Sequence, residues 1–86
     1  MKIYTVIYAP RARKQIEELP PQIKLRIDNV IVNHLSVNPF FGKALKGELK
    51  GLFSYRVGDY RIIYSISRNE LIIQVIKVMH RRDVYR

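Results

Sequence analysis

In the second half of the chain, two arginines stand on either side of a Gly-Asp pair, in the segment YRVGDYR (residues 55–61). If Gly58-Asp59 forms a two-residue turn, Arg56 and Arg61 face each other across two antiparallel strands. Two guanidinium groups about 6 Å apart repel each other by about 3 kcal/mol at an effective dielectric constant of 20. A phosphate between them reverses the sign, because each arginine can donate a fork of hydrogen bonds to its oxygens. The spacing favours an anion site, with two arginines that extend separately into solvent as the alternative.

The carboxy-terminal segment, MHRRDVYR, contains further groups that could act on a phosphate or a base. His80 can change its protonation state near neutral pH. Arg81 and Arg82 follow it directly, and Tyr85 can stack on a base, a contact worth about 1–3 kcal/mol in nucleic-acid complexes. The alternative is a solvated tail in which Tyr85 only covers the edge of a sheet.

The elements that position these residues follow from the hydrophobic pattern. Residues 2–8 are rich in β-branched and aromatic side chains and predict a strand. Apolar residues at helical spacing predict one helix from Pro10 to Leu19 and a second from Pro21 to Leu35. Each proline suits the first turn of its helix, and Asn38-Pro39 ends the second one.

The second half of the chain predicts a loop followed by a meander of strands. Residues 40–51 contain three lysines and three glycines and indicate the loop. The predicted strands are residues 52–57, 60–67 and 70–78. Two-residue turns join them, a type II′ turn at Gly58-Asp59 and a second turn at Arg68-Asn69. The order βααβββ predicts one α+β domain over residues 1–86, with two helices on one face of an antiparallel sheet.

The turn at Gly58-Asp59 also determines which side chains share a face of the sheet. Val57 then pairs with Tyr60, and Arg56 pairs with Arg61. The face that packs on the helices collects Phe53, Tyr55, Val57, Tyr60, Ile62, Tyr64 and Ile66. The opposite face collects Leu52, Ser54, Arg56, Arg61, Ile63 and Ser65, joined by Ile72, Gln74, Ile76 and Val78 if the second turn has two residues. Its polar centre predicts that this second face is left uncovered by the rest of the protein.

Composition limits the class of protein. The chain has 86 residues, 48% of them hydrophobic, which indicates a globular domain rather than a disordered segment. It has no cysteine, which excludes disulfides and thiolate metal sites, and its amino terminus has neither a signal-peptide core nor a membrane span. The net charge of +9 attracts polyanions, of which nucleic acid is the commonest. We expect a cytoplasmic nucleic-acid-binding protein, with a solvated basic surface as the alternative.

Three segments of the chain resemble the RelE toxins of the RelE/ParE superfamily, the toxic halves of type II toxin–antitoxin modules. They are ALKGELKGLF at residues 44–53, YRVGDYRIIYSI at 55–66 and VIKVMHRRDVYR at 75–86. The βαα pattern of the amino-terminal half also fits, so that the resemblance extends over the whole chain. It implies a RelE-like fold.

The resemblance implies an endoribonuclease that enters the ribosomal A site and cuts messenger RNA there, by attack of the 2′-hydroxyl on the adjacent phosphate. It implies no metal and no other cofactor. Arg61 would hold the scissile phosphate, and Arg81 stands where the family has a catalytic arginine. The catalytic candidates are Arg56, Arg61, His80, Arg81 and Tyr85. The candidates for RNA binding are Lys43, Lys46, Lys50, Arg82 and Arg86.

Two positions depart from the expected pattern. Ser54 stands where many relatives carry a lysine or arginine, and Lys46, Lys50 or His80 are the candidates to replace the missing group. Strict alternation along the last strand also puts Arg81 on the core side of the sheet. The tail must therefore turn or twist for Arg81 to join the other arginines.

The resemblance leaves two other activities open. One is a ParE-like inhibitor of DNA gyrase with the same fold and no nuclease chemistry, although the paired arginines and His80 favour the nuclease. The other is an inactive RNA-binding module, which Ser54 would allow. The partners implied are a cognate antitoxin, the ribosome and messenger RNA, with no membrane and no small-molecule cofactor.

Overall fold

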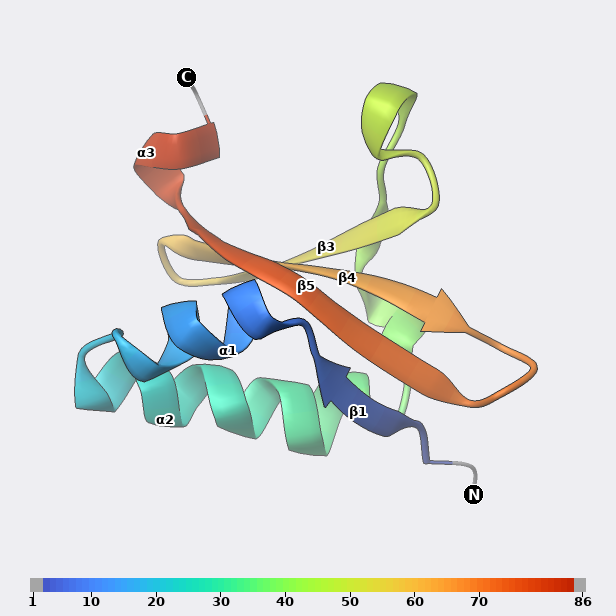
Figure 1. Ribbon diagram of the computed structural model, residues 1–86, viewed down its shortest axis with the longest axis horizontal. Coiled ribbons are helices and arrows are strands. Elements are labelled where there is room, and N and C mark those ends of the chain that lie inside the picture. The colour runs from blue at the N-terminus through green and yellow to red at the C-terminus, as the bar shows by residue number, and fades with distance from the viewer. Residues whose placement is uncertain (1–2, 85–86) are drawn as a thin grey trace.

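The computed structural model describes residues 3–84, in which five strands form one sheet and two helices cover one of its faces (Figure 1). The strands are β1 Thr5–Tyr8, β2 Lys43–Ala44, β3 Leu52–Val57, β4 Tyr60–Ser67 and β5 Ile72–His80. The helices are α1 Pro10–Glu17, α2 Pro21–Val30 and the short α3 Arg81–Val84. The strand order is β1-β5-β4-β3-β2. The predicted α+β class, with α1 and α2 on one face, is confirmed.

Prolines begin both of the longer helices, as the sequence predicted. Pro10 and Pro21 occupy the first turns of α1 and α2, where a missing backbone N–H costs nothing. A π-helical turn, Ile31–Leu35, extends α2 before the chain leaves the helix. The apolar stripes of these helices are buried against the sheet.

The core lies between these helices and the face of the sheet that the alternation predicted. Its buried members are Ala12, Ile16, Ile27, Ile31, Leu35, Val57, Ile62, Tyr64, Ile73, Val75 and Val78. Partly buried aromatic and aliphatic side chains surround them, including Phe53, Tyr55, Tyr60 and Ile66. All seven side chains that the sequence assigned to this face of β3 and β4 therefore pack on the core.

The first hairpin has the predicted register. Val57 pairs with Tyr60 and Arg56 pairs with Arg61. Gly58 has a φ of 59°, and the residue after it does not have a positive φ, a combination that fits a type II′ turn and not a type I′ turn. Glycine reaches this left-handed conformation without a steric penalty. The turn therefore aligns the two arginines directly.

The second hairpin differs from the prediction. Ser67 pairs with Ile72, so residues 68–71 form a four-residue loop in place of the expected two-residue turn. Leu71 has a φ of 55°, and its carbonyl accepts a hydrogen bond from the Thr5 N–H at 2.8 Å. The strand predicted at 70–78 accordingly runs from Ile72 to His80. The longer loop brings Leu71 next to the start of β1. Turn patterns in the sequence could not predict this contact, because Thr5 is far from Leu71 along the chain.

A β-bulge interrupts the pairing of β4 with β5. Tyr64 pairs with Val75, whereas the preceding Ile63 pairs with Lys77, so Ile76 has no counterpart on β4. A bulge inserts one residue and reverses the alternation of side chains beyond it. Val78 consequently lies in the core, opposite Ile62, and its predicted place on the other face is wrong.

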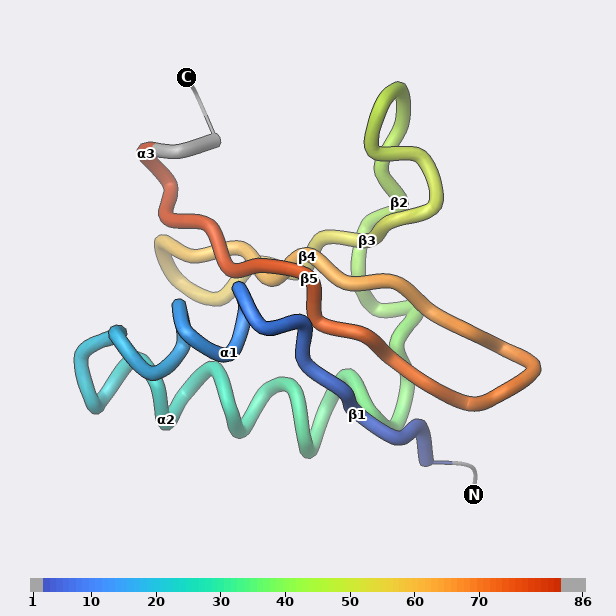
Figure 2. The backbone as a smooth tube through the Cα atoms, in the orientation of Figure 1, coloured from blue at the N-terminus to red at the C-terminus, as the bar shows by residue number. Residues whose placement is uncertain are grey.

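Two further details of the sheet were not predicted. The expected loop at 40–51 contains a two-residue strand, β2, that pairs with β3, and a 3₁₀ turn, Gly47–Leu49. β1 runs parallel to β5, in a sheet that is otherwise antiparallel. Figure 2 traces how the chain returns through α1 and α2 before it reaches β2.

Candidate functional site

The face of the sheet opposite α1 and α2, here called the open face, carries three of the predicted site residues, Lys43, Arg56 and Arg61. Side chains that pair across strands form rows on this face. The first row, nearest the turn at Gly58, contains Arg56, Arg61 and Met79. The second row contains Lys43, Ser54, Ile63 and Lys77. The third row contains Leu52, Ser65, Gln74 and Ile7, so the cations are confined to the first two rows.

Arg56 and Arg61 form the centre of the first row. Arg56 is exposed, and its Nε–H donates to the carbonyl of Gly58 at 3.1 Å, which uses one of the five N–H donors of the guanidinium. Arg61 is half-buried. Their neighbours along β3 and β4 pack on the core, so both arginines lie on the face that α1 and α2 leave uncovered.

The two central residues of the second row, Ser54 and Ile63, are buried. Ser54 is 5% exposed and Ile63 is 3% exposed, although neither lies beneath a helix. The Ser54 hydroxyl has no hydrogen-bond partner among the described residues. A buried hydroxyl without a partner is unfavourable by about 1–3 kcal/mol, which makes Ser54 an unusual choice for this position. The sequence predicted correctly that Ser54 and Ile63 lie on this face, but it did not predict that they are buried.

The carboxy-terminal segment turns at the end of β5. α3 begins at Arg81, whose backbone N–H donates to the carbonyl of Asp59 at 2.6 Å. This bond joins the start of α3 to the turn between Arg56 and Arg61. Strict alternation put Arg81 on the core side, but β5 ends at His80 and Arg81 begins α3, so the chain turns at this point as the sequence required. Residue 81 is exposed.

His80 lies on the other side of β5 from Lys77 and Met79. It pairs with Tyr60, and the two rings meet edge to face with centroids 5.0 Å apart. Its Nδ1 accepts a hydrogen bond from the backbone N–H of Arg82 at 3.2 Å, so it also holds the first turn of α3. The predicted Tyr85 and Arg86 lie outside the described residues.

The predicted RNA-binding lysines lie on and beside the open face. Lys43 occupies β2 at the end of the second row, while Lys46 and Lys50 bracket the 3₁₀ turn Gly47–Leu49. All three are exposed. The segment between β2 and β3 and the helix α3 both project from the sheet on the side away from α1 and α2 (Figures 1 and 2). Exposed cations therefore flank the open face on two sides.

Lys77 is a cation of the open face that sequence reasoning missed. It is half-buried and lies in the second row, opposite Ile63. If side chains alternate without interruption along the last strand, residue 77 lies on the core side. A lysine there looks like an exception to the apolar pattern of that side. Only the bulge turns it to the open face, and no local sequence signal marks that bulge.

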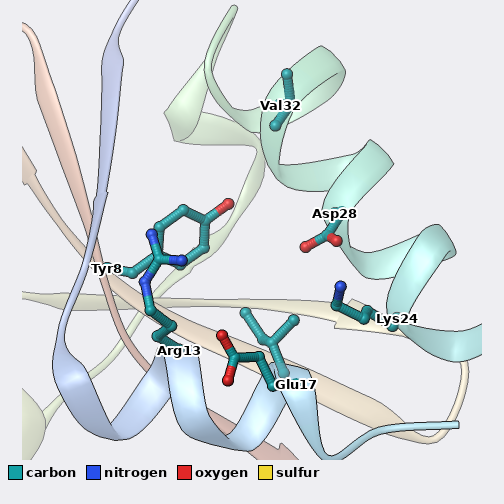
Figure 3. A pocket seen from close by; sticks show the side chains of 7 residues that line it. Tyr8, Arg13, Glu17, Lys24, Asp28 and Val32 are labelled. Atoms are coloured by element: carbon teal, nitrogen blue, oxygen red, sulfur yellow. The ribbon is translucent and has the colours of Figure 1, made fainter. Parts of the chain in front are cut away.

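A pocket of about 330 Å³ lies on the helical side, between α1 and α2 (Figure 3). Arg13 and Lys24 line it together with Glu17 and Asp28, so its charges balance. The Arg13 guanidinium lies 5.4 Å from the ring centre of Tyr8. Burial, and secondarily the Asp28 carboxylate, raise the pKa of the Tyr8 hydroxyl. A pocket of balanced charge does not select for an anion, and we do not assign it to the phosphate site.

Residues 3–84 lack two other kinds of site. No helix in that range is long and apolar enough to cross a membrane. The same residues contain no group of three or more histidine, aspartate or glutamate side chains that could hold a metal ion.

Comparison with known proteins gives consistent matches. A family described as the ParE toxin of type II toxin–antitoxin systems, parDE, matches residues 6–85. Toxin RelG of Mycobacterium tuberculosis is 38% identical over 84 residues, which cover 96% of this chain and 97% of that protein. Toxin RelE of the same organism is 32% identical over 84 residues, covering 96% of this chain and 87% of that protein.

Solved structures agree. The crystal structure of the toxin–antitoxin complex RelBE2 from M. tuberculosis contains a chain that superposes with a TM-score of 0.87 at 36% identity. The match covers 92% of this chain and 99% of that one. The archaeal RelE–RelB complex from Pyrococcus horikoshii OT3 contains another, with a TM-score of 0.69 at 27% identity, covering 92% and 96%.

Proposed function

The chain belongs to the RelE/ParE superfamily of type II toxin–antitoxin toxins, and on that premise we propose that it cleaves messenger RNA in the ribosomal A site. The observation that carries the proposal is the direct pairing of Arg56 with Arg61 on the open face. Like charges directly opposite in a sheet are destabilising, and a bound phosphate removes that cost. The bond from Arg81 to the Asp59 carbonyl brings a third arginine to the same end of the sheet.

The proposed reaction needs only the RNA and this basic surface. The 2′-hydroxyl loses its proton, the O2′–P bond forms as the P–O5′ bond breaks, and the 5′-oxygen leaves with a proton. The products are a 2′,3′-cyclic phosphate and a 5′-hydroxyl end. Arg61 holds the scissile phosphate, and Arg56 and Arg81 neutralise the charge that develops on its oxygens, the kind of electrostatic stabilisation that contributes most in such reactions.

The proton-transfer groups remain predictions from the resemblance, namely His80 and Tyr85. His80 is bonded to the first turn of α3 and packs against Tyr60, so its substitution tests positioning as well as proton transfer. A His80→Asn variant that keeps an acceptor at the position of Nδ1 but cannot carry a proton distinguishes the two, because only a proton-transfer role changes the pH–rate profile.

The proposal is tested with purified protein and ribosomes that carry a defined message, with the RNA ends mapped by primer extension. Arg61→Ala and Arg81→Ala should each lower the cleavage rate by about 100-fold or more, as loss of one transition-state donor does elsewhere. Arg11→Ala, which removes the same charge from an exposed position of α1, is the matched control and should cut like the unmodified protein. Cleavage that survives in both test variants rejects the assignment.

Inhibition of DNA gyrase is the second candidate, because the matching family is described by its ParE member and Ser54 replaces a basic residue of the RelE pattern. A supercoiling assay separates the two activities. Inhibition of gyrase by protein that leaves ribosome-bound message intact would reverse the order of the candidates. Salt-sensitive RNA binding without cut ends and without gyrase inhibition would instead indicate the inactive RNA-binding module.

We also propose that a cognate antitoxin is the physiological partner, since the similar structures from M. tuberculosis and P. horikoshii were solved as toxin–antitoxin complexes. Large apolar side chains remain exposed for such a partner, among them Ile3, Leu25, Phe40 and Phe41. Expression of the chain alone should arrest growth, and co-expression of its antitoxin should restore it. Harmless expression of the intact chain would contradict both toxin activities.

A further inference from the structure

The basic surface has a neutral residue at its centre. Ser54 lies between the cations of the two rows, and its buried hydroxyl has no partner among the described residues. The resemblance to the RelE toxins implies a lysine or arginine at this position in many relatives. We propose that Lys77, which the bulge at Ile76 turns onto the open face, is a catalytic residue that supplies this missing positive charge to the reacting RNA. This inference rests on the proposed nuclease function.

The strand register places Ser54 and Lys77 at equivalent positions on the two sides of β4, each a diagonal neighbour of Arg61. Both are direct neighbours of Ile63, one on β3 and the other on β5. Arg61 lies two residues before Ile63 on β4, so both are also diagonal neighbours of Arg61. Diagonal neighbours in an antiparallel pair lie about 7–8 Å apart, within reach of long side chains. A cation moved from position 54 to position 77 therefore keeps its distance from the arginine that holds the phosphate.

The other proposed substitutes for Ser54 do not have this geometry. Lys46 and Lys50 belong to the segment that projects from the sheet between β2 and β3. His80 pairs with Tyr60 and is on the core side of β5. Lys43 lies one strand beyond Ser54, further from Arg61. Within residues 3–84, Lys77 is the lysine whose register makes it a diagonal neighbour of Arg61.

Burial supports the same orientation of Lys77. Ile63 is 3% exposed on the face that α1 and α2 do not cover, and its direct neighbours across the strands are Ser54 and Lys77. A serine is too short to cover an isoleucine, whereas the four-carbon stem of a lysine can do so while its ammonium stays in water. Lys77 is itself half-buried, as this arrangement requires.

In the reaction, Lys77 acts as a fixed positive charge and not as a base. The 2′-hydroxyl gives its proton to the general base as the O2′–P bond forms, and the 5′-oxygen takes a proton from the general acid as the P–O5′ bond breaks, the two roles for which His80 and Tyr85 are the candidates. The ammonium remains protonated throughout and stabilises the negative charge on the 2′-oxygen and the phosphorane oxygens. If Lys77 contributes only its charge, arginine should be able to replace it. A cation at another position of the second row, such as position 54, should also support cleavage.

The test is single-turnover cleavage of ribosome-bound message by a set of variants. Lys77→Met removes the charge but keeps a stem that covers Ile63, and it should lower the rate at least 100-fold, with Lys77→Gln as a second charge-free variant. Lys77→Arg should stay within about 10-fold of the unmodified protein. The double variant Lys77→Ser with Ser54→Lys moves the cation to the other side of Ile63 and should recover to within about 10-fold. Lys14→Met on α1 is the control and should change nothing.

The outcomes separate this inference from the proposed function. If the unmodified protein and Lys77→Met cleave equally, Lys77 has no catalytic role and the nuclease assignment stands. If Lys77→Met is inactive and the double variant, with an unchanged melting temperature, is inactive too, the equivalence of positions 54 and 77 is wrong. If the unmodified protein cuts no message on ribosomes, the proposed function fails, and the role of Lys77 fails with it.

Discussion

Tyr64 shows how one buried residue holds the edge of the candidate site. Its side chain is fully buried in the core, and its hydroxyl donates to the carbonyl of Pro39 at 2.6 Å. Gly42 packs against the same hydroxyl so closely that a Cβ at this position would overlap it. Lys43 follows directly and opens β2, so these contacts fix the end of the second row.

Gly42→Ala should therefore destabilise the protein by roughly 1–3 kcal/mol, the range for overpacking a buried site. The overlap must be relieved by moving either the Tyr64 ring or the chain before β2. Urea unfolding measures the loss. Gly47→Ala is a poor control because Gly47 has a φ of 69°, a conformation that strains any alanine. Ala44→Gly changes the same short segment without an overlap, and it should lower the free energy of unfolding by less than Gly42→Ala does.

The same tyrosine predicts a dependence of stability on alkaline pH. Burial raises the pKa of Tyr64 to about 12, from about 10 in the unfolded chain. Because the folded state keeps this proton while the unfolded state loses it, the contribution of Tyr64 is complete below pH 10. It is lost at about 1.4 kcal/mol per pH unit as the pH rises toward 12.

Urea unfolding at pH 8, 10 and 11.5 tests this for the unmodified protein and Tyr64→Phe. The phenylalanine variant should be less stable at pH 8, because the Pro39 carbonyl loses its donor. The difference between the two proteins should shrink above pH 10. A difference that stays constant to pH 11.5 would show that Tyr64 is not responsible for the alkaline loss.

At the scale of elements, the bulge in β5 is the feature that organises both faces of the sheet. Before it, β5 follows the alternation expected from β4; after it, Val78 turns into the core and Lys77 and Met79 turn to the open face. Bulges recur beside active sites, where they redirect a side chain. Here one inserted residue turns Lys77 to the open face.

Two neighbouring substitutions test this alternation. Val78 is 6% exposed in the core, so Val78→Ala should cost about 2 kcal/mol of unfolding free energy. Met79 is half-buried on the open face, and Met79→Ala should cost less than about 1 kcal/mol. Equal costs, or a larger cost at Met79, would mean that the bulge is not where the register places it.

At the scale of the whole molecule, the arrangement of charge matters more than its total of +9. α1 and α2 occupy one side of the sheet, and the projecting segments around Gly47–Leu49 and α3 occupy the other (Figure 1). The cations of the open face and of these two segments thus share one side. Under the proposed function, RNA that lies on this side would meet cationic side chains both beneath it and beside it.

The salt dependence of RNA binding tests this arrangement. Lys46→Ala and Lys50→Ala should each reduce the slope of log K against log salt by about 0.7, the value for one phosphate contact on a single strand. Lys14→Ala removes the same charge from α1, on the other side, and should leave the slope unchanged. The measurement is fluorescence anisotropy with a labelled single-stranded RNA; a reduction by Lys14→Ala equal to the other two would indicate nonspecific attraction.

The sequence by itself determined the features that depend on neighbouring residues. Helix starts at Pro10 and Pro21 and the alternation of β3 and β4 are periodic or steric properties of short segments. The pairing of Arg56 with Arg61 follows from the turn at Gly58-Asp59, because a two-residue turn leaves one register. The candidate arginine pair was therefore predictable without a structure.

The tertiary structure alone decided which distant segments meet. The parallel pairing of β1 with β5, the addition of β2 and the bulge at Ile76 depend on strands far apart in the chain. A local pattern carries no information on these pairings, because their free energy comes from packing and hydrogen bonds that form only when the sheet closes. For that reason Arg61 was predicted as a site residue, while Lys77 was found only when β4 and β5 were seen together.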